Sequence, residues 1–145
     1  PRRRADLDTV FMLSRTPEEA RAIKPLLAFH YAGALPVYAS SSAYGARDDS
    51  RNQDLSGTTI VELPWLLGSN PALQQSLVGA NSDYYTRLNA LGADAYLLQS
   101  RLVQLQAGPD ALIRGDTGLL TMNSQLQIVR ELPPARFDGD RLRPL

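Results

Sequence analysis

The sequence predicts an α/β fold with parallel strands, flanking helices and a C-terminal hairpin. Residues 7–39 contain a strand-like run, a helical segment and a second strand-like run, together the length of a βαβ unit. Residues 71–108 carry apolar side chains at helical spacing. Residues 118–132 contain two strand-like runs around an Asn-Ser turn, which is typical of a hairpin. One domain of this class suits a chain of 145 residues.

The first strand and the first helix have clear boundaries. Residues 7–13 are almost continuously apolar, as in a strand buried on both faces of a parallel sheet. Thr16 and Glu19 form a capping box, which predicts that a helix begins there. We expect this helix over 17–32, with a bend around Pro25, because an interior proline removes a backbone hydrogen bond.

Two further short strands are predicted. Residues 35–39 should lie parallel to the first strand and next to it, after a right-handed crossover. The polar residues 40–57 predict a long loop, and residues 58–62 predict the third strand. Trp65, the only tryptophan, follows this strand. A core position is more typical for it than an interface anchor, and both remain possible.

The middle of the chain predicts two helices. A short one should cover 71–78, and Ser82 should cap a second one. We expect Gly92 to interrupt the second helix. Tyr85, Leu88 and Leu91 share one face before this glycine, and an apolar stripe follows it, made of Ala95, Leu98, Leu102 and Leu105.

In the predicted hairpin, apolar side chains alternate with polar ones. Leu126 and Ile128 should therefore be buried, and Gln125 and Gln127 should be more exposed. The proline-rich tail over 133–145 should be irregular or an edge strand.

The hairpin is preceded by Arg114-Gly115-Asp116, which spells a cell-adhesion tripeptide. A tripeptide often occurs by chance. Gly115 and Gly118 supply turn geometry here, so we interpret the tripeptide as a turn that enters the hairpin and has no partner.

Composition excludes several kinds of function. The formal net charge is zero, which gives no electrostatic case for binding nucleic acid or an anionic membrane. The chain has no cysteine, so disulfides, thiolate chemistry and cysteine-ligated zinc are excluded. His30 and Lys24 are the only histidine and the only lysine. Because the chain starts at Pro1 and enters a strand-like run almost at once, we expect it to be part of a longer protein.

A motif search predicts no catalytic residue, no metal site and no cofactor. The glycine-rich dinucleotide fingerprint, the P-loop, the zinc-protease helix and the serine-hydrolase elbow are all missing. Residues 48–54 place oxygen ligands at alternate positions, but they lack the glycine and the closing glutamate of a calcium loop. His30 falls late in the first helix, which favours a packing or surface role over that of a general base.

One polar cluster is a candidate ligand site. Ser40, Ser41, Ser42 and Tyr44 follow the carboxyl end of a predicted parallel strand, where open α/β sheets bind ligands. Hydroxyl groups and free backbone amides could hold a polar ligand there. A hydrated loop is the alternative.

Four stretches together resemble one family. They are ARAIKPLLAFHYAGALPVYASS, LSGTTIVELPWLL, RLNALGADAYLL and GDTGLLTMNSQLQIVRELPPARFDGDRLRPL. Their order and spacing are similar to those of the C-terminal domain of the penicillin-binding protein activators, the LppC lipoprotein family. The resemblance spans nearly the whole chain, and the PWLL, ALGADAY and RELPPARF segments are specific in combination.

The resemblance implies a fold and a cellular role. The fold would be the later part of a domain like the type I periplasmic binding proteins, a Rossmann-like fold with two α/β lobes. The chain would cross between the lobes near 40–57 and again near 115–124. The role would be that of a lipid-anchored protein on the periplasmic side of the outer membrane. Its partner would be a class A penicillin-binding protein, a peptidoglycan synthase.

The chain therefore has three candidate functions. The favoured one is a non-enzymatic regulator of peptidoglycan synthesis. Its partner contact would use exposed aromatic or arginine anchors, for which Tyr44, Arg47 and Arg51 in the long loop are candidates. The second is a small-ligand binding protein, for an amino acid or a peptide, that uses the serines after Ala39. The third, an enzyme of Rossmann-like architecture, is disfavoured because His, Lys and Cys are so scarce.

Overall fold

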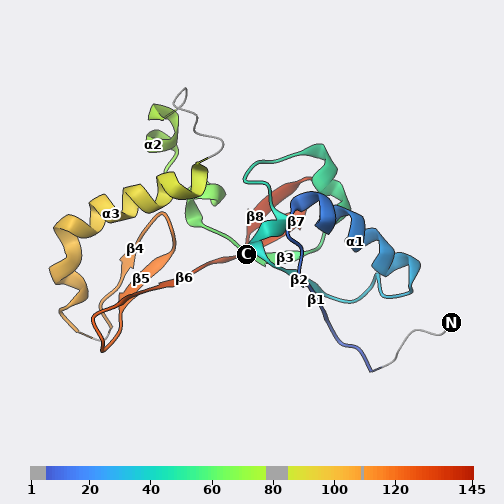
Figure 1. Ribbon diagram of the computed structural model, residues 1–145, viewed down its shortest axis with the longest axis horizontal. Helices are drawn as coiled ribbons and strands as arrows, with labels where there is room; N and C mark the ends of the chain where they lie inside the picture. Colours follow the sequence, from blue (N-terminus) through green and yellow to red (C-terminus); the bar gives the residue numbers. More distant parts are fainter. Residues whose placement is uncertain (1–5, 78–84, 109) are drawn as a thin grey trace. The chain divides into compact units, whose positions relative to one another are not determined.

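The chain forms two compact units. The computed structural model describes residues 6–77, 85–108 and 110–145 (Figure 1). Unit 1 is Pro1–Val61 together with Pro134–Leu145, and unit 2 is Glu62–Pro133. The crossings between lobes near 40–57 and 115–124, which the family resemblance implies, stay a prediction.

Unit 1 contains a mixed five-stranded sheet in the order β1-β2-β3-β7-β8. The first three strands run parallel, and the last two pair antiparallel. Val10 pairs with Val37, which confirms the predicted parallel neighbours. The strands are β1 (Val10–Met12), β2 (Val37–Ala39), β3 (Thr59–Val61), β7 (Pro134–Asp138) and β8 (Arg141–Pro144).

Helix α1 (Pro17–Phe29) connects β1 and β2 and begins as predicted. The Thr16 hydroxyl accepts a hydrogen bond from the Glu19 backbone N–H at 3.2 Å. The Glu19 carboxylate in turn accepts from the Arg15 backbone N–H at 2.7 Å. These contacts satisfy donors that a helix start otherwise leaves without partners. Pro25 lies inside the helix without ending it.

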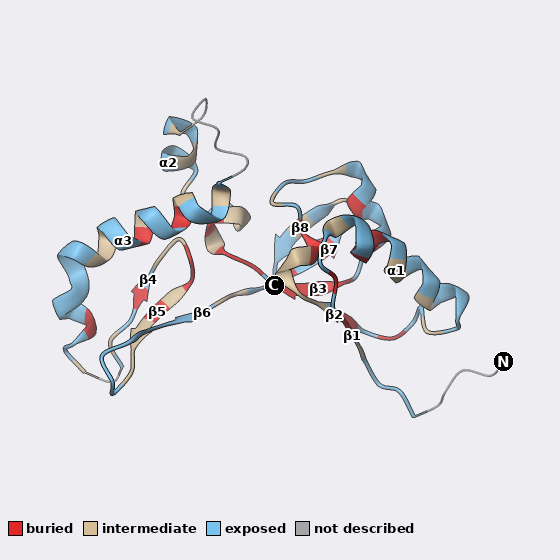
Figure 2. Cartoon of the chain, viewed as in Figure 1, coloured by how far each residue is buried: buried red, intermediate tan, exposed pale blue. Residues whose placement is uncertain are grey.

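The sheet of unit 1 is buried on one face only. Met12, Val37, Ile60 and Phe137 are all buried, whereas Phe11 is 75% exposed. Buried segments, in red, are visible at β3 and β7 in Figure 2. The prediction that the first strand is buried on both faces is therefore wrong for this chain.

The segment after β2 is more ordered than the predicted long loop. It contains two 3₁₀ helices, η1 (Ser41–Ala43) and η2 (Ser50–Leu55). The first contacts β3 and the second contacts β7, and both contact α1. They thus fill the space between the helix and the sheet.

Unit 2 combines helices with a three-stranded antiparallel sheet in the order β4-β5-β6. Helix α3 lies alongside this sheet (Figure 1). Its twenty residues continue through Gly92, so the predicted interruption is wrong. Asn70 caps α2. Val78, the last residue predicted for this helix, and Ser82, the cap predicted for the next one, lie outside the described residues. The elements are η3 (Pro64–Leu67), α2 (Pro71–Ser76), α3 (Thr86–Leu105), β4 (Ile113–Arg114), β5 (Leu119–Met122) and β6 (Ile128–Glu131).

Two apolar clusters hold unit 2. Leu105 of α3 packs against Ile113 and Leu120 of the sheet. Trp65 packs with Leu63 and Ala90, so the core interpretation of this tryptophan is confirmed. The apolar stripe predicted after Gly92 is only partly turned inward: Leu105 is buried and Leu98 half-buried, whereas Ala95 and Leu102 are exposed. Leu88 and Leu91, on the face predicted before Gly92, are exposed as well.

The predicted hairpin is present as β5 and β6, in which Met122 pairs with Ile128. Its burial pattern was predicted wrongly. Leu126 is 71% exposed and has a left-handed backbone, with φ of 61°, so it belongs to the turn and not to a strand. Ile128 is also exposed. The tail over 133–145 is not irregular: β7 lies inside the five-stranded sheet and β8 forms its edge.

Candidate functional site

The candidate serines follow the carboxyl end of β2, as the sequence predicts, and lie beside the carboxyl end of β1. The Ser40 and Ser42 hydroxyl oxygens are 2.6 Å apart. The Ser42 hydroxyl donates to the Ser14 backbone carbonyl just after β1, and the Ser40 hydroxyl lies 3.5 Å from the same carbonyl. Ser41 is half-buried in η1. The hydroxyls of Ser40 and Ser42 thus join the ends of β1 and β2.

This arrangement limits what the serines can bind. A serine hydroxyl has one donor hydrogen, and Ser42 uses its hydrogen on the Ser14 carbonyl. The Ser14 hydroxyl is buried and has no hydrogen-bond partner among the described residues. The cluster therefore mainly holds the loop in place. Only the hydroxyl lone pairs of Ser40 and Ser42 remain to accept a hydrogen bond from a ligand.

Tyr44 is not an exposed anchor. Only 5% of the residue is accessible. Its ring packs edge-on against Phe137 with centroids 5.9 Å apart, and its hydroxyl donates to the Asp48 carboxylate at 3.4 Å. The exposure that a partner-contact role of Tyr44 requires is therefore absent, whereas its role as a hydroxyl ligand stays a prediction. The aromatic ring instead fills the core between η1 and β7.

Arg47 and Arg51 are exposed, as their proposed contact role requires. Arg51 binds the Asp49 carboxylate through two nitrogens, at 2.6 Å for Nη2 and 3.1 Å for Nε. Asp49 also caps η2 by accepting from the Arg51 backbone N–H. The pKa of the Asp49 carboxyl lies well below its ordinary value, chiefly because the Arg51 side chain donates hydrogen bonds to it. Arg51 is thus fixed in position beside a charged carboxylate.

Beneath this surface, a buried arginine joins α1 to η2. The Arg21 Nη2 donates to the Asn52 Oδ1 at 2.8 Å. Asn52 is fully buried, and its amide donates to the backbone carbonyl of Asp140 at 3.2 Å in the turn between β7 and β8. The Arg21 Nε and Nη1 have no hydrogen-bond partner among the described residues, although the Glu18 carboxylate lies 3.6 Å from Nη1.

The Arg-Gly-Asp segment is held inside unit 2 by a buried carboxylate that sequence analysis did not single out. Asp94 of α3 is 2% exposed. Its Oδ1 accepts from the Asp116 backbone N–H at 2.7 Å. Its Oδ2 accepts from the backbone N–H and the hydroxyl of Thr117, at 2.7 and 2.5 Å. Gly115 is needed here, because a Cβ at that position would lie 2.5 Å from the Asp94 Oδ2.

Asp116 itself binds the segment that precedes α2. Its carboxylate accepts from the Ser69 hydroxyl at 2.7 Å and from the Asn70 amide at 3.0 Å. Its backbone carbonyl accepts from the Trp65 N–H at 2.9 Å. Gly115 and Asp116 lie in the loop between β4 and β5, as the predicted turn requires, and the absence of an external partner stays a prediction. The segment is a structural junction whose aspartate is occupied within the chain.

A second buried acid lies at the start of unit 2. Glu62 is 1% exposed, and its Oε2 accepts from the Arg87 Nη2 at 2.6 Å. Its Oε1 accepts from the Leu63 backbone N–H. Glu62, Asp94 and Asp116 belong to three of the four stretches that carry the family resemblance, so these stretches meet as one polar framework.

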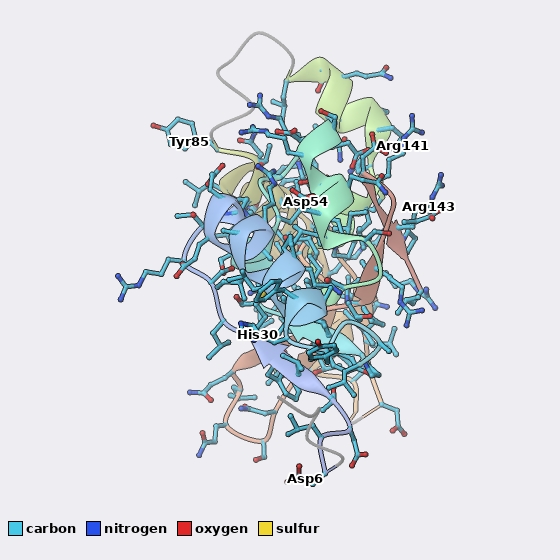
Figure 3. All side chains as sticks on the ribbon, turned by 90° about the vertical axis from the view of Figure 1, so that its right-hand side faces the viewer. Asp6, His30, Asp54, Tyr85, Arg141 and Arg143 are labelled. Carbon is cyan, nitrogen blue, oxygen red and sulfur yellow. The ribbon has the colours of Figure 1, made fainter. Side chains whose placement is uncertain are left out.

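The remaining chemistry-bearing residues do not assemble. His30 follows the last residue of α1, is exposed, and contacts the Phe29 ring edge-on (Figure 3). No group of three His, Cys, Asp or Glu side chains suited to a metal ion occurs among the described residues. None of the helices that the structure describes has the length and apolarity needed to cross a membrane.

The family model and the most similar relatives agree on one protein family. The model of the family described as "LppC putative lipoprotein" matches residues 1–139. The chain is 35% identical over 143 residues to the penicillin-binding protein activator LpoA of Klebsiella pneumoniae, covering 95% of this chain and 20% of that protein. It is 34% identical to the LpoA of Vibrio vulnificus, covering 91% and 22%. The chain thus spans about a fifth of the length of these relatives.

Solved structures show the same fold. The LpoA C-domain of Haemophilus influenzae, described as a regulator of PBP1A, superposes with a TM-score of 0.81 at 22% identity, over 98% of this chain and 46% of that one. A proposed branched-chain amino acid ABC transporter protein of Rhodospirillum rubrum superposes with a TM-score of 0.61 at 19% identity, over 95% and 44%. The fold is therefore that of the LpoA C-domain and of periplasmic-binding-protein-like structures. Together with the match of the family model to residues 1–139, this places the chain in the LppC lipoprotein family.

Proposed function

We propose that this chain is part of a regulator of peptidoglycan synthesis that activates a class A penicillin-binding protein and has no catalytic activity of its own. The observation that carries the proposal is the 35% identity over 95% of the chain to a relative named as such an activator. The chain would be the later part of the C-terminal domain. The whole protein would act from the periplasmic side of the outer membrane, through a lipid anchor outside this chain.

The geometry supports a binding role. The buried acids Glu62 and Asp94 bind backbone N–H groups and structural partners, so their acceptors are occupied. The only histidine is exposed and lies against Phe29. A general base must reach the proton that it removes from a nucleophile or a water. The Asp116 carboxylate does accept from the Ser69 hydroxyl, but the Asn70 amide binds the same carboxylate, as expected of a structural junction.

A chimera tests this function. The stretch of Klebsiella pneumoniae LpoA that matches this chain is replaced by residues 1–145, and the chimera is added to the Klebsiella class A penicillin-binding protein with lipid-linked precursor. We expect the chimera to raise the rate of glycan polymerisation or cross-linking. A chimera that keeps the thermal midpoint of the native activator but gives no stimulation at micromolar concentration would contradict the proposal.

The partner surface is proposed at Arg47 and Arg51, without Tyr44. Both arginines are exposed, and arginine is enriched at interface hot spots. Replacing both with alanine in the chimera should raise the concentration for half-maximal stimulation about tenfold, as loss of a hot-spot side chain does. The matched control is Arg101→Ala on α3, also an exposed arginine. Equal stimulation by the double variant and by this control would exclude the proposed surface.

The second candidate function is binding of a small polar ligand, such as an amino acid or a peptide, at Ser40, Ser41 and Ser42. The position of these serines at the carboxyl ends of β1 and β2 favours it. Thermal shifts with amino acids, peptides and wall fragments test it, because a ligand at 100 times its dissociation constant adds about 2.7 kcal/mol. A shift that Ser40→Ala abolishes would support this candidate, and the absence of any shift would exclude it.

A further inference from the structure

Helix α1 has an apolar stripe on the side away from its buried residues. This outer stripe consists of four exposed residues, Ala22, Pro25, Leu26 and Phe29. They recur at positions i, i+3, i+4 and i+7, so they share one face of the helix. Ala20, Ile23 and Leu27 are buried or half-buried and occupy the opposite face. Helix α1 lies toward the viewer in Figure 3, where His30 marks its end.

Tyr31, just after this helix, has a left-handed backbone with φ of 61°. The Ala32 N–H donates to the Leu27 carbonyl at 2.7 Å. The Tyr31 N–H donates to the Ala28 carbonyl at 3.1 Å. This pair of bonds is the Schellman motif, in which glycine is the usual residue at the left-handed position. Tyrosine at this position therefore carries backbone strain that glycine would avoid.

Burial of the tyrosine side chain does not compensate for this strain. Tyr31 is 61% exposed, and Phe29, two residues earlier, is 77% exposed. Strained residues cluster at binding sites. Neighbouring exposed apolar side chains mark interaction surfaces in soluble proteins. The outer stripe and Tyr31 together are therefore a docking surface on α1.

The charges of α1 indicate the chemistry of its partner. The two exposed charged residues of the helix, Glu18 and Glu19, are acidic. Its two basic residues are turned inward, with Arg21 buried and Lys24 half-buried. The last turn contains no basic residue to offset the negative end of the helix dipole. A surface that fits is an apolar groove with basic residues at its rim, and an anionic membrane is disfavoured.

We infer that the outer stripe and Tyr31 dock into an apolar groove with a basic rim on the class A penicillin-binding protein. Helices that bind in such grooves use anchors at the spacing found in the outer stripe. Phe29 and Tyr31 would be the central anchors, because aromatic side chains are enriched in the cores of interfaces. The inference rests on the function proposed above and adds a contact on α1 to the one at Arg47 and Arg51.

The dissociation constant between the chimera and the Klebsiella class A penicillin-binding protein tests the inference. Phe29→Ala should raise this constant about tenfold, as loss of a hot-spot side chain does, and should leave the thermal midpoint unchanged. Tyr31→Gly should also raise the constant about tenfold. The same change should raise the thermal midpoint by a few degrees, because glycine relieves the left-handed strain. A purely structural role of Tyr31 would leave the affinity unchanged.

Leu126→Gly is the matched control for Tyr31→Gly. Leu126 is also exposed and also has a φ of 61°, but it lies in the turn between β5 and β6. Its replacement should raise the thermal midpoint and leave the dissociation constant unchanged. Glu18→Gln tests the basic rim: it should weaken binding severalfold at low salt and make the affinity less dependent on salt.

Unchanged affinity in both Phe29→Ala and Tyr31→Gly would overturn the inference and leave the proposed function intact. No binding by the wild-type chimera would contradict both. Binding of the chimera to anionic phospholipid vesicles that Phe29→Ala weakens would assign the outer stripe to a membrane instead. A dimer of the chimera that Phe29→Ala dissociates would assign it to a second copy. A lower thermal midpoint of Phe29→Ala with unchanged affinity would show that the rest of the domain covers it.

Discussion

Asp94 in unit 2 and Arg21 in unit 1 have comparable positions, since each is a buried charged residue on a helix that contacts a neighbouring loop. Asp94 accepts three hydrogen bonds from residues 116–117, and each of its oxygens is used. Arg21 has five donor hydrogens. Only its Nη2 makes a hydrogen bond, and its Nε and Nη1 have none among the described residues.

Burial of a charge and its contribution to stability are therefore separate properties. A buried carboxylate that is fully hydrogen-bonded fixes its donors, and removing it leaves all of them without a partner. A buried arginine with few hydrogen bonds has lost its hydration, and fewer protein hydrogen bonds compensate for that cost. We therefore expect unit 2 to depend on Asp94 more than unit 1 depends on Arg21.

The largest effect should come from Asp94→Ala. It leaves the N–H groups of Asp116 and Thr117 and the Thr117 hydroxyl without their acceptor. The free energy of unfolding should fall by about 3 kcal/mol or more, since each buried unsatisfied group costs about 1–3 kcal/mol. Urea denaturation of the whole chain measures it, with the exposed Asp110→Ala as the control. A loss below about 1 kcal/mol would contradict the anchoring role.

Gly115→Ala should have the next largest effect, because it disturbs the same anchor from the loop side. The new Cβ would lie 2.5 Å from the Asp94 Oδ2, so the loop must shift, at a cost of about 1–3 kcal/mol. Gly92→Ala in α3 is the matched control. A Cβ there meets no atom within 4 Å, and a helix gains about 0.5–1 kcal/mol from this change. The two denaturation midpoints should move in opposite directions.

Arg21→Met should cost about 1–3 kcal/mol, less than Asp94→Ala, because it leaves one buried acceptor, the Asn52 Oδ1, without its donor, whereas Asp94→Ala leaves three donors without an acceptor. The same urea titration as for Asp94→Ala gives the comparison. A loss as large as that of Asp94→Ala would show that the Glu18 and Asp49 carboxylates compensate Arg21 more fully than its hydrogen bonds indicate.

The smallest effect should be a pH dependence in unit 1. The pKa of Asp49 lies below its ordinary value of 3.8, mainly because of the hydrogen bonds from the Arg51 side chain. The stabilisation is therefore present above pH 3.8, and it is lost as the pH falls toward the native pKa. In Arg51→Ala, the Asp49 pKa measured by NMR should move up toward 3.8, and the two proteins should converge in stability at low pH. An unchanged Asp49 pKa in Arg51→Ala would assign the shift to another neighbour.

The framework of the fold could be predicted from local patterns. The capping box at Thr16, the parallel strands around 10–12 and 37–39, and the hairpin of β5 and β6 all follow from short-range signals. The predictions failed where tertiary contacts determine the local structure. Gly92 does not break α3, because its neighbours Ala90 and Asp94 are buried against the rest of unit 2. Leu126 is exposed because the turn is longer than the Asn-Ser pair suggested.

The candidate site was predicted in part. The serines do meet at the strand ends, as parallel topology requires. Tyr44 was misjudged because a polar loop sequence does not reveal that two 3₁₀ helices turn the ring onto Phe137. Asp94 was missed, although a signal existed: it is the only acid in the apolar stretch RLNALGADAYLL. An isolated carboxylate on a helix face that packs against other elements is a candidate for a buried hydrogen-bond acceptor.

The adjacent entry and exit of unit 2 bear on how the chain folds. Val61 at the end of β3 pairs with Pro134 at the start of β7, and the Glu62 N–H donates to the Pro133 carbonyl. Pairing β3 with β7 closes a loop that comprises all of residues 62–133. Closing a long flexible loop carries an entropic cost and slows folding. Once unit 2 has folded, its two ends are already together, and this distant pairing becomes a local one. We therefore expect the sheet of unit 1 to form after unit 2, and substitutions of Asp94 should slow the pairing of β3 with β7 although Asp94 contacts neither strand.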